Sequence, residues 1–218
     1  MLNIAIDGPA GAGKSTIAKM LAKKLDIIYL DTGAMYRACA YHALRGGISV
    51  HDVEAVLAMM DDIALDISYD EDGAQRVFVN GEDVTPYIRE HAISQMASDI
   101  SKIHEVRLKL VDMQRRFAAE HACVLDGRDI TSFVLKDCVN KFYLDASIEV
   151  RARRRCQELA QKGQTVSFEE MCADIARRDH NDMTRDFAPL VRVPDAIYID
   201  TSDMTLEQVL QAVESQLR

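Results

Sequence analysis

The chain has 218 residues, and its 26 lysines and arginines against 35 aspartates and glutamates leave a formal net charge of −9. This acidic balance argues against general nucleic-acid binding, which needs many cations at phosphates. A composition that is 48% hydrophobic excludes an intrinsically disordered chain. No apolar run reaches the roughly 18 residues of a membrane-spanning helix, and a signal peptide is not evident. We therefore expect a cytoplasmic protein with no membrane partner. We also expect a monomer, although these features do not determine the oligomeric state.

Short apolar strands alternate with helical patterns along most of the chain. We predict a strand at residues 2–7, a helix at 14–25, a strand at 27–30 and helices at 34–44 and 53–60. Over residues 63–88 the pattern changes to short antiparallel strands, with Asn80-Gly81 as a hairpin signal. A long amphipathic helix over 103–117 follows, then strands at 123–125 and 139–144. Arginine-rich helices, a strand at 196–199 and a closing helix from Thr205, with Gln208 in a capping box, complete the chain.

This alternation predicts an α/β fold. Its core is expected to be a doubly wound parallel sheet with helices on both faces. A small antiparallel β insert and a helical, arginine-rich segment are added to that core. The five cysteines are scattered and contain no C-x-x-C, so neither a disulfide framework nor a zinc site is indicated.

The N-terminal glycine-rich segment is the strongest functional signal. It reads Gly8-Pro9-Ala10-Gly11-Ala12-Gly13-Lys14-Ser15 and fits G-x-x-x-x-G-K-[ST] between a strand and a helix. Glycines allow backbone N–H groups to turn toward phosphate oxygens, and Lys14 and the helix N-terminus supply positive charge. The Ser15 hydroxyl is suited to Mg²⁺, and Thr16 offers one more hydroxyl to a phosphate. The segment predicts binding of a nucleoside triphosphate.

Three further motifs follow expected strands or lie on an expected helix. They are Asp31-Thr32-Gly33-Ala34-Met35-Tyr36-Arg37, Asp126-Gly127-Arg128-Asp129, and Arg178-Asp179-His180-Asn181-Asp182-Met183-Thr184-Arg185 before Ala188-Pro189-Leu190. The carboxyl ends of parallel strands line the ligand crevice, so the first two should face the glycine-rich loop. Asp126 would hold Mg²⁺ through water or orient Lys14. Plain structural alternatives are a helix cap at Asp31, a tight turn at 126–129 and a private ion-pair network at 178–185.

Positive charge is concentrated late in the chain. Eight of the 17 arginines lie within residues 151–192, where Lys162 is the single lysine. Guanidinium groups donate in a planar fork that suits phosphate or carboxylate. We expect Arg151, Arg154 and Arg155, with Arg178 and Arg185 beyond them, to close over phosphates and to exclude water. The tip of this closing segment is expected at residues 161–167. Surface ion pairs are the alternative reading.

Taken together, the four motifs resemble those of bacterial cytidylate kinases, in the same order and from Ile4 to about Val209. The resemblance implies a single P-loop kinase domain over residues 1–218. Its core would span about 1–60, 100–150 and 188–218, with an acceptor-binding insert at about 61–99 and a lid at about 151–187. It also implies transfer of the γ-phosphoryl group of ATP, with Mg²⁺, to CMP and dCMP, giving CDP or dCDP and ADP in pyrimidine nucleotide metabolism.

The resemblance also carries residue roles over by position. It implies that Thr32, Ser98, Arg107, Asp129, Arg178, Asp182 and Arg185 surround the CMP, with Arg37 and Arg128 around its phosphate. The expected catalytic residues are Lys14, Arg128, Arg154, Arg178 and Arg185; Arg154 would also contact ATP together with residues 8–16.

Two residue types suit the cytosine base. A carboxylate such as Asp129 and a guanidinium such as Arg107 complement its N4 donor and its N3 and O2 acceptors, whereas uracil would present an acceptor to the carboxylate.

The chain departs from the family pattern at Thr131-Ser132, where the family usually has Gly-Thr. If that glycine has a positive φ, threonine would be strained there.

Other functions remain open at the level of the sequence. A P-loop kinase acting on UMP, AMP or shikimate is the nearest, although the β insert and Asp126-Gly127-Arg128-Asp129 argue against shikimate. A regulatory ATPase would hydrolyse ATP without an acceptor and would not need two acceptor-side arginine motifs. Nucleic-acid binding through the arginine-rich stretch is opposed by the aspartates interleaved with it.

Overall fold

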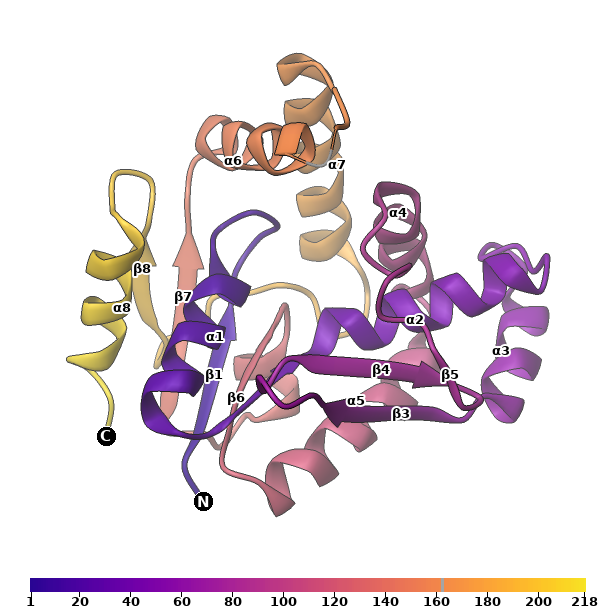
Figure 1. The fold of residues 1–218 in the computed structure, drawn as a ribbon, viewed down its shortest axis with the longest axis horizontal. Coiled ribbons are helices and arrows are strands. Elements are labelled where there is room, and N and C mark those ends of the chain that lie inside the picture. Colours follow the sequence, from indigo (N-terminus) through magenta and orange to yellow (C-terminus); the bar gives the residue numbers. More distant parts are fainter. Residues whose placement is uncertain (162) are drawn as a thin grey trace. The chain divides into compact units, whose positions relative to one another are not determined.

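The computed structural model describes residues 1–161 and 163–218, so Lys162, within the expected tip at 161–167, lies outside the described residues. The chain forms two compact units, which are Met1–Ile27 with Ala122–Arg218, and Ile28–His121. Figure 1 shows the helices and strands of both units.

The first unit contains four parallel strands in the order β6-β1-β7-β8. They are β1 (Asn3–Asp7), β6 (Cys123–Gly127), β7 (Asn140–Asp145) and β8 (Ile197–Asp200). Side chains on both faces of β1, β6 and β7 are buried, which explains why their sequences are continuous apolar runs rather than alternating ones. The register pairs Asp7 with Gly127 and with Tyr143, so the carboxyl ends of three strands lie together.

Four α-helices and one π-helical turn complete this unit. They are α1 (Lys14–Leu25), η1 (Ile130–Val134), α6 (Ile148–Gln161), α7 (Phe168–Thr184) and α8 (Leu206–Glu214). Helix α1 packs on β6 and α8, whereas α6 and α7 pack on each other through Ala152, Leu159, Met171 and Ile175. The predicted capping box of Thr205 and Gln208 is confirmed at the start of α8.

The second unit joins a small sheet to four helices and strand β2 (Ile28–Asp31). Its helices are α2 (Thr32–Arg45), α3 (Val53–Asp62), α4 (His91–Ile100) and α5 (His104–Glu120), and its sheet contains β3 (Leu65–Tyr69), β4 (Gln75–Val79) and β5 (Glu82–Asp83).

A turn precedes α4, in which the Ile88 N–H donates to the Val84 carbonyl oxygen at 3.2 Å. The strands pair in the antiparallel order β3-β4-β5, and Asn80 and Gly81 both have positive φ in the hairpin that the sequence predicted. The core of the unit brings Val77 of the sheet together with Ile93 and Leu110 of α4 and α5.

The predicted fold class is confirmed: a parallel α/β core with a small antiparallel sheet. Most predicted elements occur within a few residues of their expected bounds. Two elements, α4 and η1, were not predicted. Helix α4 packs against α2 through Ile93, Ala97 and Ile100, so a distant partner stabilises a segment whose own pattern is short. The division into core, acceptor-binding insert and lid stays a prediction.

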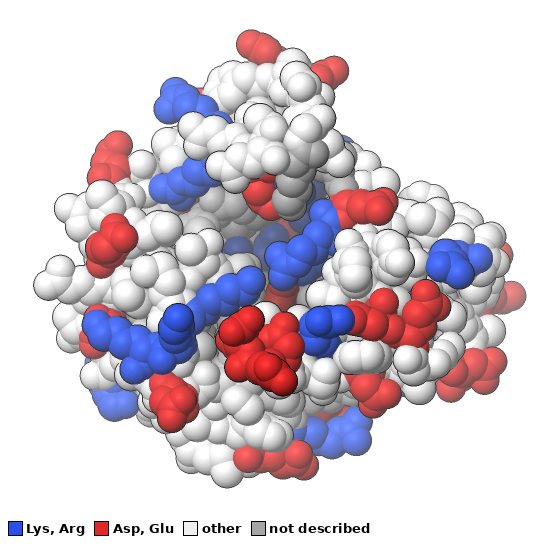
Figure 2. Space-filling view, in the orientation of Figure 1, with Lys and Arg blue, Asp and Glu red and all other residues white. Residues whose placement is uncertain are grey.

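Among the described residues, no helix is long and apolar enough to cross a membrane. Basic and acidic side chains are interspersed on the face shown in Figure 2. This mixture is consistent with the acidic net charge and differs from the one-sign surface typical of general nucleic-acid binders.

Candidate nucleotide site

The glycine-rich loop lies between β1 and α1, as predicted, and its backbone needs glycine at two positions. Gly8 has φ 145°, and a Cβ there would collide with the Leu144 carbonyl oxygen of β7. Gly11 has φ 80°, and a Cβ there would lie 3.1 Å from the Arg151 Cβ of α6. These φ values disfavour other residues. The loop is therefore packed directly on β7 and α6, which explains the glycines physically.

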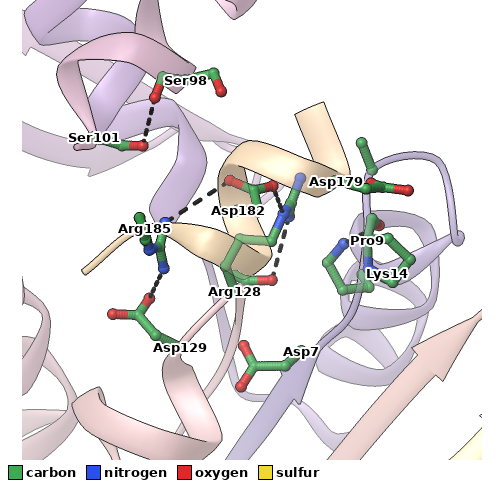
Figure 3. A network of polar contacts seen from close by, with 12 residues as sticks. Asp7, Pro9, Lys14, Ser98, Ser101, Arg128, Asp129, Asp179, Asp182 and Arg185 are labelled. Atoms are coloured by element: carbon green, nitrogen blue, oxygen red, sulfur yellow. Dashed lines mark hydrogen bonds and ion pairs between the residues drawn. The ribbon is translucent and has the colours of Figure 1, made fainter. Parts of the chain in front are cut away.

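Lys14 is the first residue of α1 and is 5% exposed. Its Nζ donates to the carbonyl oxygen of Pro9 at 2.7 Å, within the loop (Figure 3). Burial, and after it the charge of Arg128, lower the pKa of Lys14 to about 7, although Asp126 and Asp182 act in the opposite direction. An anion in the loop would stabilise the charged ammonium. Lys14 is thus placed where a bound phosphate group would stabilise its charge.

Ser15 and Asp126 form the pair that the sequence assigned to Mg²⁺. The Ser15 Oγ donates to Asp126 Oδ2 at 2.9 Å, and Asp126 is buried at the end of β6. A hydroxyl and a carboxylate are hard oxygen donors, and Mg²⁺ is commonly held by one or two such groups with water and substrate phosphates. The two residues therefore fit a magnesium ion bound together with a nucleotide.

An arginine–carboxylate network joins β6 to the end of α7 (Figure 3). The Nε of Arg128 donates to Asp182 Oδ2 at 2.7 Å, and the Arg185 guanidinium lies 3.8 Å from carboxylate oxygens of both Asp129 and Asp182. Burial alone would raise the pKa of Asp182, but the charges of Arg128, Arg185 and Arg178 hold it below its usual range. Four of the predicted acceptor residues are thereby brought together, with Arg178 one helical turn before Asp182.

The Ala188-Pro189-Leu190 motif holds Arg185 in place. Arg185 ends α7, and its Nε donates to the Ala188 carbonyl oxygen at 2.7 Å. Ala188 has φ 47°, a conformation that alanine rarely adopts, and the Leu190 N–H donates to the Asp182 carbonyl oxygen at 2.7 Å. The chain folds back over the end of α7, and this turn directs the Arg185 side chain.

Arg154 and Thr16, both assigned to ATP by the sequence, lie elsewhere in the first unit. Arg154 donates to the Thr201 hydroxyl at 3.1 Å and to the Thr201 carbonyl oxygen at 2.6 Å, after β8. Thr201 is itself hydrogen-bonded to the Ala12 carbonyl oxygen of the glycine-rich loop (3.2 Å). Arg154 is therefore linked to the loop through one residue. Thr16 is exposed on α1.

Asp31, Thr32 and Arg37 lie at the start of α2 in the second unit. The Asp31 carboxylate caps the helix by accepting from the Ala34 N–H at 2.9 Å and also accepts from Arg37 at 2.8 Å. The charges of Arg37 and Arg89 hold the pKa of Asp31 below its usual range despite burial, which would raise it. Thr32 is buried as the first residue of the helix. The helix cap considered from the sequence is therefore present at Asp31, which also holds Arg37.

Ser98 and Arg107 are neighbours within the same unit. Ser98 lies on α4, and Arg107 is a buried residue of α5 whose guanidinium donates to the Ser101 carbonyl oxygen at 3.2 Å and lies 5.3 Å from the ring centroid of Tyr36. The Ser101 hydroxyl donates in turn to the Ser98 carbonyl oxygen at 2.9 Å. Ser101 thus links the buried guanidinium of Arg107 to the backbone of Ser98.

Thr131 does not have the positive φ under which strain would arise, so no strain is present there. The positive-φ residues other than glycine that the structure describes are Asp26, Asn80 and Ala188. Thr131 instead lies in η1 and donates from its N–H and its hydroxyl to Asp7 Oδ2, at 2.7 and 2.6 Å. Burial raises the pKa of Asp7 to about 6, while these donors oppose that rise. Thr131, at which the chain departs from the family pattern, is therefore a buried hydrogen-bond donor to Asp7 at the end of β1.

Arg151, which was expected to close over phosphates, is bonded to other parts of the protein. Arg151 is 4% exposed and pairs with Asp179 of α7 at 2.7 Å. Arg155 pairs with Glu158 at 2.7 Å on its own helix. Two residues of the site, Asp7 and Thr201, were not singled out from the sequence. A carboxylate at the end of an apolar strand is a signal by which Asp7 could have been found.

A strand, a glycine-rich loop with a buried lysine, and a hydroxyl–carboxylate pair beside a parallel sheet define a P-loop phosphotransferase. The family model described as cytidylate kinase matches residues 4–218. The chain belongs to the cytidylate kinase family.

Individual relatives agree with this assignment. A cytidylate kinase of Caldicellulosiruptor bescii is 49% identical over 212 residues, which cover 97% of this chain and 93% of that protein. One from Caldicellulosiruptor saccharolyticus is 50% identical with the same coverage. Among solved structures, an uncharacterized protein from Eubacterium ventriosum has a TM-score of 0.55 at 13% identity, covering 100% of this chain and 98% of that one. This last similarity concerns the fold alone.

Proposed function

We propose that the protein transfers the γ-phosphoryl group of ATP to the phosphate of CMP and of dCMP, forming ADP and CDP or dCDP. One observation carries this proposal besides family membership. Arg128, Asp182 and Arg185 form a largely buried network, and the charges of Arg128 and Asp182 act on Lys14 of the glycine-rich loop. A guanidinium whose charge acts on the loop lysine, with a second one in the same network, suits a second phosphate beside a bound triphosphate. A nucleotide-binding switch would not need them.

The reaction follows from positioning and charge neutralisation. An oxygen of the CMP phosphate attacks the γ-phosphorus of ATP, the bond from that phosphorus to its bridging β–γ oxygen breaks, and ADP leaves. The attacking oxygen is already anionic near neutral pH, so the step needs no dedicated base. Lys14 would neutralise the β and γ phosphates, and Arg128, Arg178 and Arg185 would neutralise the acceptor and the transferred group.

Each guanidinium has enough donors for this role. Arginine carries five N–H groups, and Asp182 and the Gly127 carbonyl oxygen take two of those on Arg128. Asp182 thus orients Arg128 while it also offsets its charge.

Arg154 would contact ATP from α6. Ser15 and Asp126 would hold Mg²⁺, which when bound supplies charge neutralisation at the phosphates.

The acceptor base would be read by Asp129, Arg107 and Ser98. A carboxylate accepts from the cytosine N4 amino group, and a guanidinium donates to N3 or O2. Thr32 and Asp182 would complete the contacts to CMP, and Arg37 would contact its phosphate. Uracil would leave the carboxylate facing a carbonyl oxygen. Such an unpaired buried group costs about 1–3 kcal/mol, which favours cytidine over uridine nucleotides.

A coupled ADP-release assay with CMP, dCMP, UMP and AMP, and a control without acceptor, tests this proposal. Rapid turnover with CMP and dCMP is expected, and ADP release without an acceptor should be slow. Arg185→Ala and Lys14→Ala should each lower kcat by orders of magnitude with an intact fold. Arg177→Ala is a matched control, because Arg177 is an exposed neighbour on α7 that pairs with Asp174. Turnover that does not depend on CMP would contradict the proposal. We also propose that the protein is a monomer and is located in the cytoplasm.

A further inference from the structure

Arg151 is a buried arginine whose guanidinium is held from three directions. Its Nε donates to the Ala146 carbonyl oxygen at 2.8 Å, and one terminal nitrogen donates to the Ala10 carbonyl oxygen of the glycine-rich loop at 3.0 Å. The other terminal nitrogen lies 2.7 Å from Asp179 Oδ2. Three partners in fixed directions leave a planar fork almost no rotational freedom. The Ala10 carbonyl oxygen is therefore bound by a rigid donor.

This contact determines how one peptide group of the loop is oriented. The Ala10 carbonyl and the Gly11 N–H belong to the same peptide plane, and in a trans peptide they point in opposite directions. The structure describes no cis peptide bond. With the carbonyl oxygen directed toward Arg151, the Gly11 N–H is turned away from α6, toward the side on which a glycine-rich loop holds phosphate oxygens.

The packing around Gly11 supports the same conclusion. A Cβ at Gly11 would lie 3.1 Å from the Arg151 Cβ and 3.4 Å from the Arg151 carbonyl oxygen. The loop therefore rests on the backbone and the first side-chain atoms of Arg151, while the guanidinium binds the preceding carbonyl group. Two separate contacts with one residue fix both the position and the rotation of the Ala10–Gly11 peptide.

We propose that Arg151 is a positioning residue for the donor nucleotide, which orients the Gly11 N–H toward a phosphate of ATP or ADP. The residue acts through the loop and does not touch the nucleotide. Asp179 serves as the clamp that keeps the guanidinium on Ala10, because a buried carboxylate 2.7 Å away fixes its charge and direction. This inference rests on the proposed nucleotide binding and adds to it a residue that the glycine-rich motif itself does not contain.

The test measures ADP and CMP binding separately, by calorimetry, in the full-length protein. Arg151→Met keeps the length of the side chain and removes every donor. Arg153→Met is the matched control, because Arg153 is exposed on the same helix. We expect the ADP dissociation constant of Arg151→Met to rise about 10- to 100-fold, as for the loss of one hydrogen bond to a charged group. Its CMP dissociation constant should change less than threefold.

A spectroscopic readout separates positioning from a general loss of structure. In the wild type, the Gly11 amide proton should move downfield when ADP is added, because it gains a bond to a phosphate. In Arg151→Met this shift should disappear. Arg151→Lys should recover part of the ADP affinity, since an ammonium can still donate to the Ala10 carbonyl oxygen.

A second pair of variants covers a failure of Arg151→Met to fold, since that change leaves the Asp179 charge buried and unpaired. Asp179→Asn and Arg151→Met/Asp179→Asn differ in the Arg151 side chain, with its bonds to the Ala146 and Ala10 carbonyl oxygens, and neither leaves an unpaired Asp179 charge. The double variant should bind ADP about 10- to 100-fold more weakly. The assignment would be overturned if the wild type and Arg151→Met bound ADP equally well, or if Asp179→Asn and the double variant did. An equal loss of ADP and CMP binding would also overturn it.

These outcomes are distinguishable from a failure of the proposed function. If the wild type binds ADP more tightly than Arg151→Met but does not phosphorylate CMP, only the proposed reaction is contradicted. Wild-type protein that phosphorylates CMP, with Arg151→Met binding ADP normally, would contradict only the role of Arg151.

Discussion

Lys14 should destabilise the protein when no nucleotide is bound. Its ammonium group is buried at the start of α1, and burial lowers its pKa from 10.5 to about 7. The folded protein therefore releases the Lys14 proton near pH 7, whereas the unfolded chain keeps it up to about pH 10.5. Between these pH values the unfolded state binds more protons, so stability rises with pH through this residue.

The magnitude follows from the pKa shift. At about 1.36 kcal/mol per unit, a shift from 10.5 to about 7 corresponds to about 5 kcal/mol, and to about 4 kcal/mol at pH 7, where the group is half protonated. Replacing Lys14 with methionine removes this cost and loses the hydrogen bond to Pro9, worth about 1 kcal/mol. Lys14→Met should thus be about 3 kcal/mol more stable than the wild type at pH 7, while its kinase activity is lost.

Urea unfolding of the nucleotide-free protein at pH 7 and pH 10 measures this difference. The advantage of Lys14→Met should be small at pH 10, because only about 1 kcal/mol of the cost remains there. Groups present in both proteins cancel in the comparison. Lys23→Met, on an exposed site of the same helix, should show neither the gain nor its pH dependence. A Lys14→Met protein that is less stable than the wild type, or a difference that is the same at both pH values, would refute this reasoning.

Two further predictions concern β6 and the turn after it. Asp129→Asn should lower the preference for CMP over UMP, as the ratio of kcat/KM values, about 10-fold or more, because an amide can donate to the uracil carbonyl oxygen; an unchanged ratio would remove Asp129 from base recognition. Thr131→Val should cost about 1–3 kcal/mol of unfolding free energy by removing the hydroxyl bond to Asp7. The loss should be greater at pH 8 than at pH 5, since this bond favours the ionised carboxylate, and Thr131→Ser should restore most of it in urea titrations.

Local patterns explain why much of the molecule was predictable. The glycine-rich loop, the Asn80-Gly81 hairpin and the capping box at Thr205 each follow from conformational demands within a few residues. Positive φ at Gly11 or at Gly81 requires glycine wherever the segment lies in a fold. The continuous apolar runs of β1, β6 and β7 likewise predicted buried parallel strands. The family resemblance rested on the same short motifs.

The remaining features depend on contacts between distant parts of the chain. Arg151 and Arg153 are two residues apart and have the same chemistry, yet one is buried and the other exposed. The partner that decides this, the Ala10 carbonyl oxygen, is 141 residues away. The role of Thr131 was not predictable either, because its bonding partner Asp7 lies 124 residues earlier in the chain. The sequence alone determined where a triphosphate loop and its capping residues must lie, because the backbone there obeys local rules. Only tertiary structure decided which charged side chains hold that loop, because burial and pairing are properties of the packed chain.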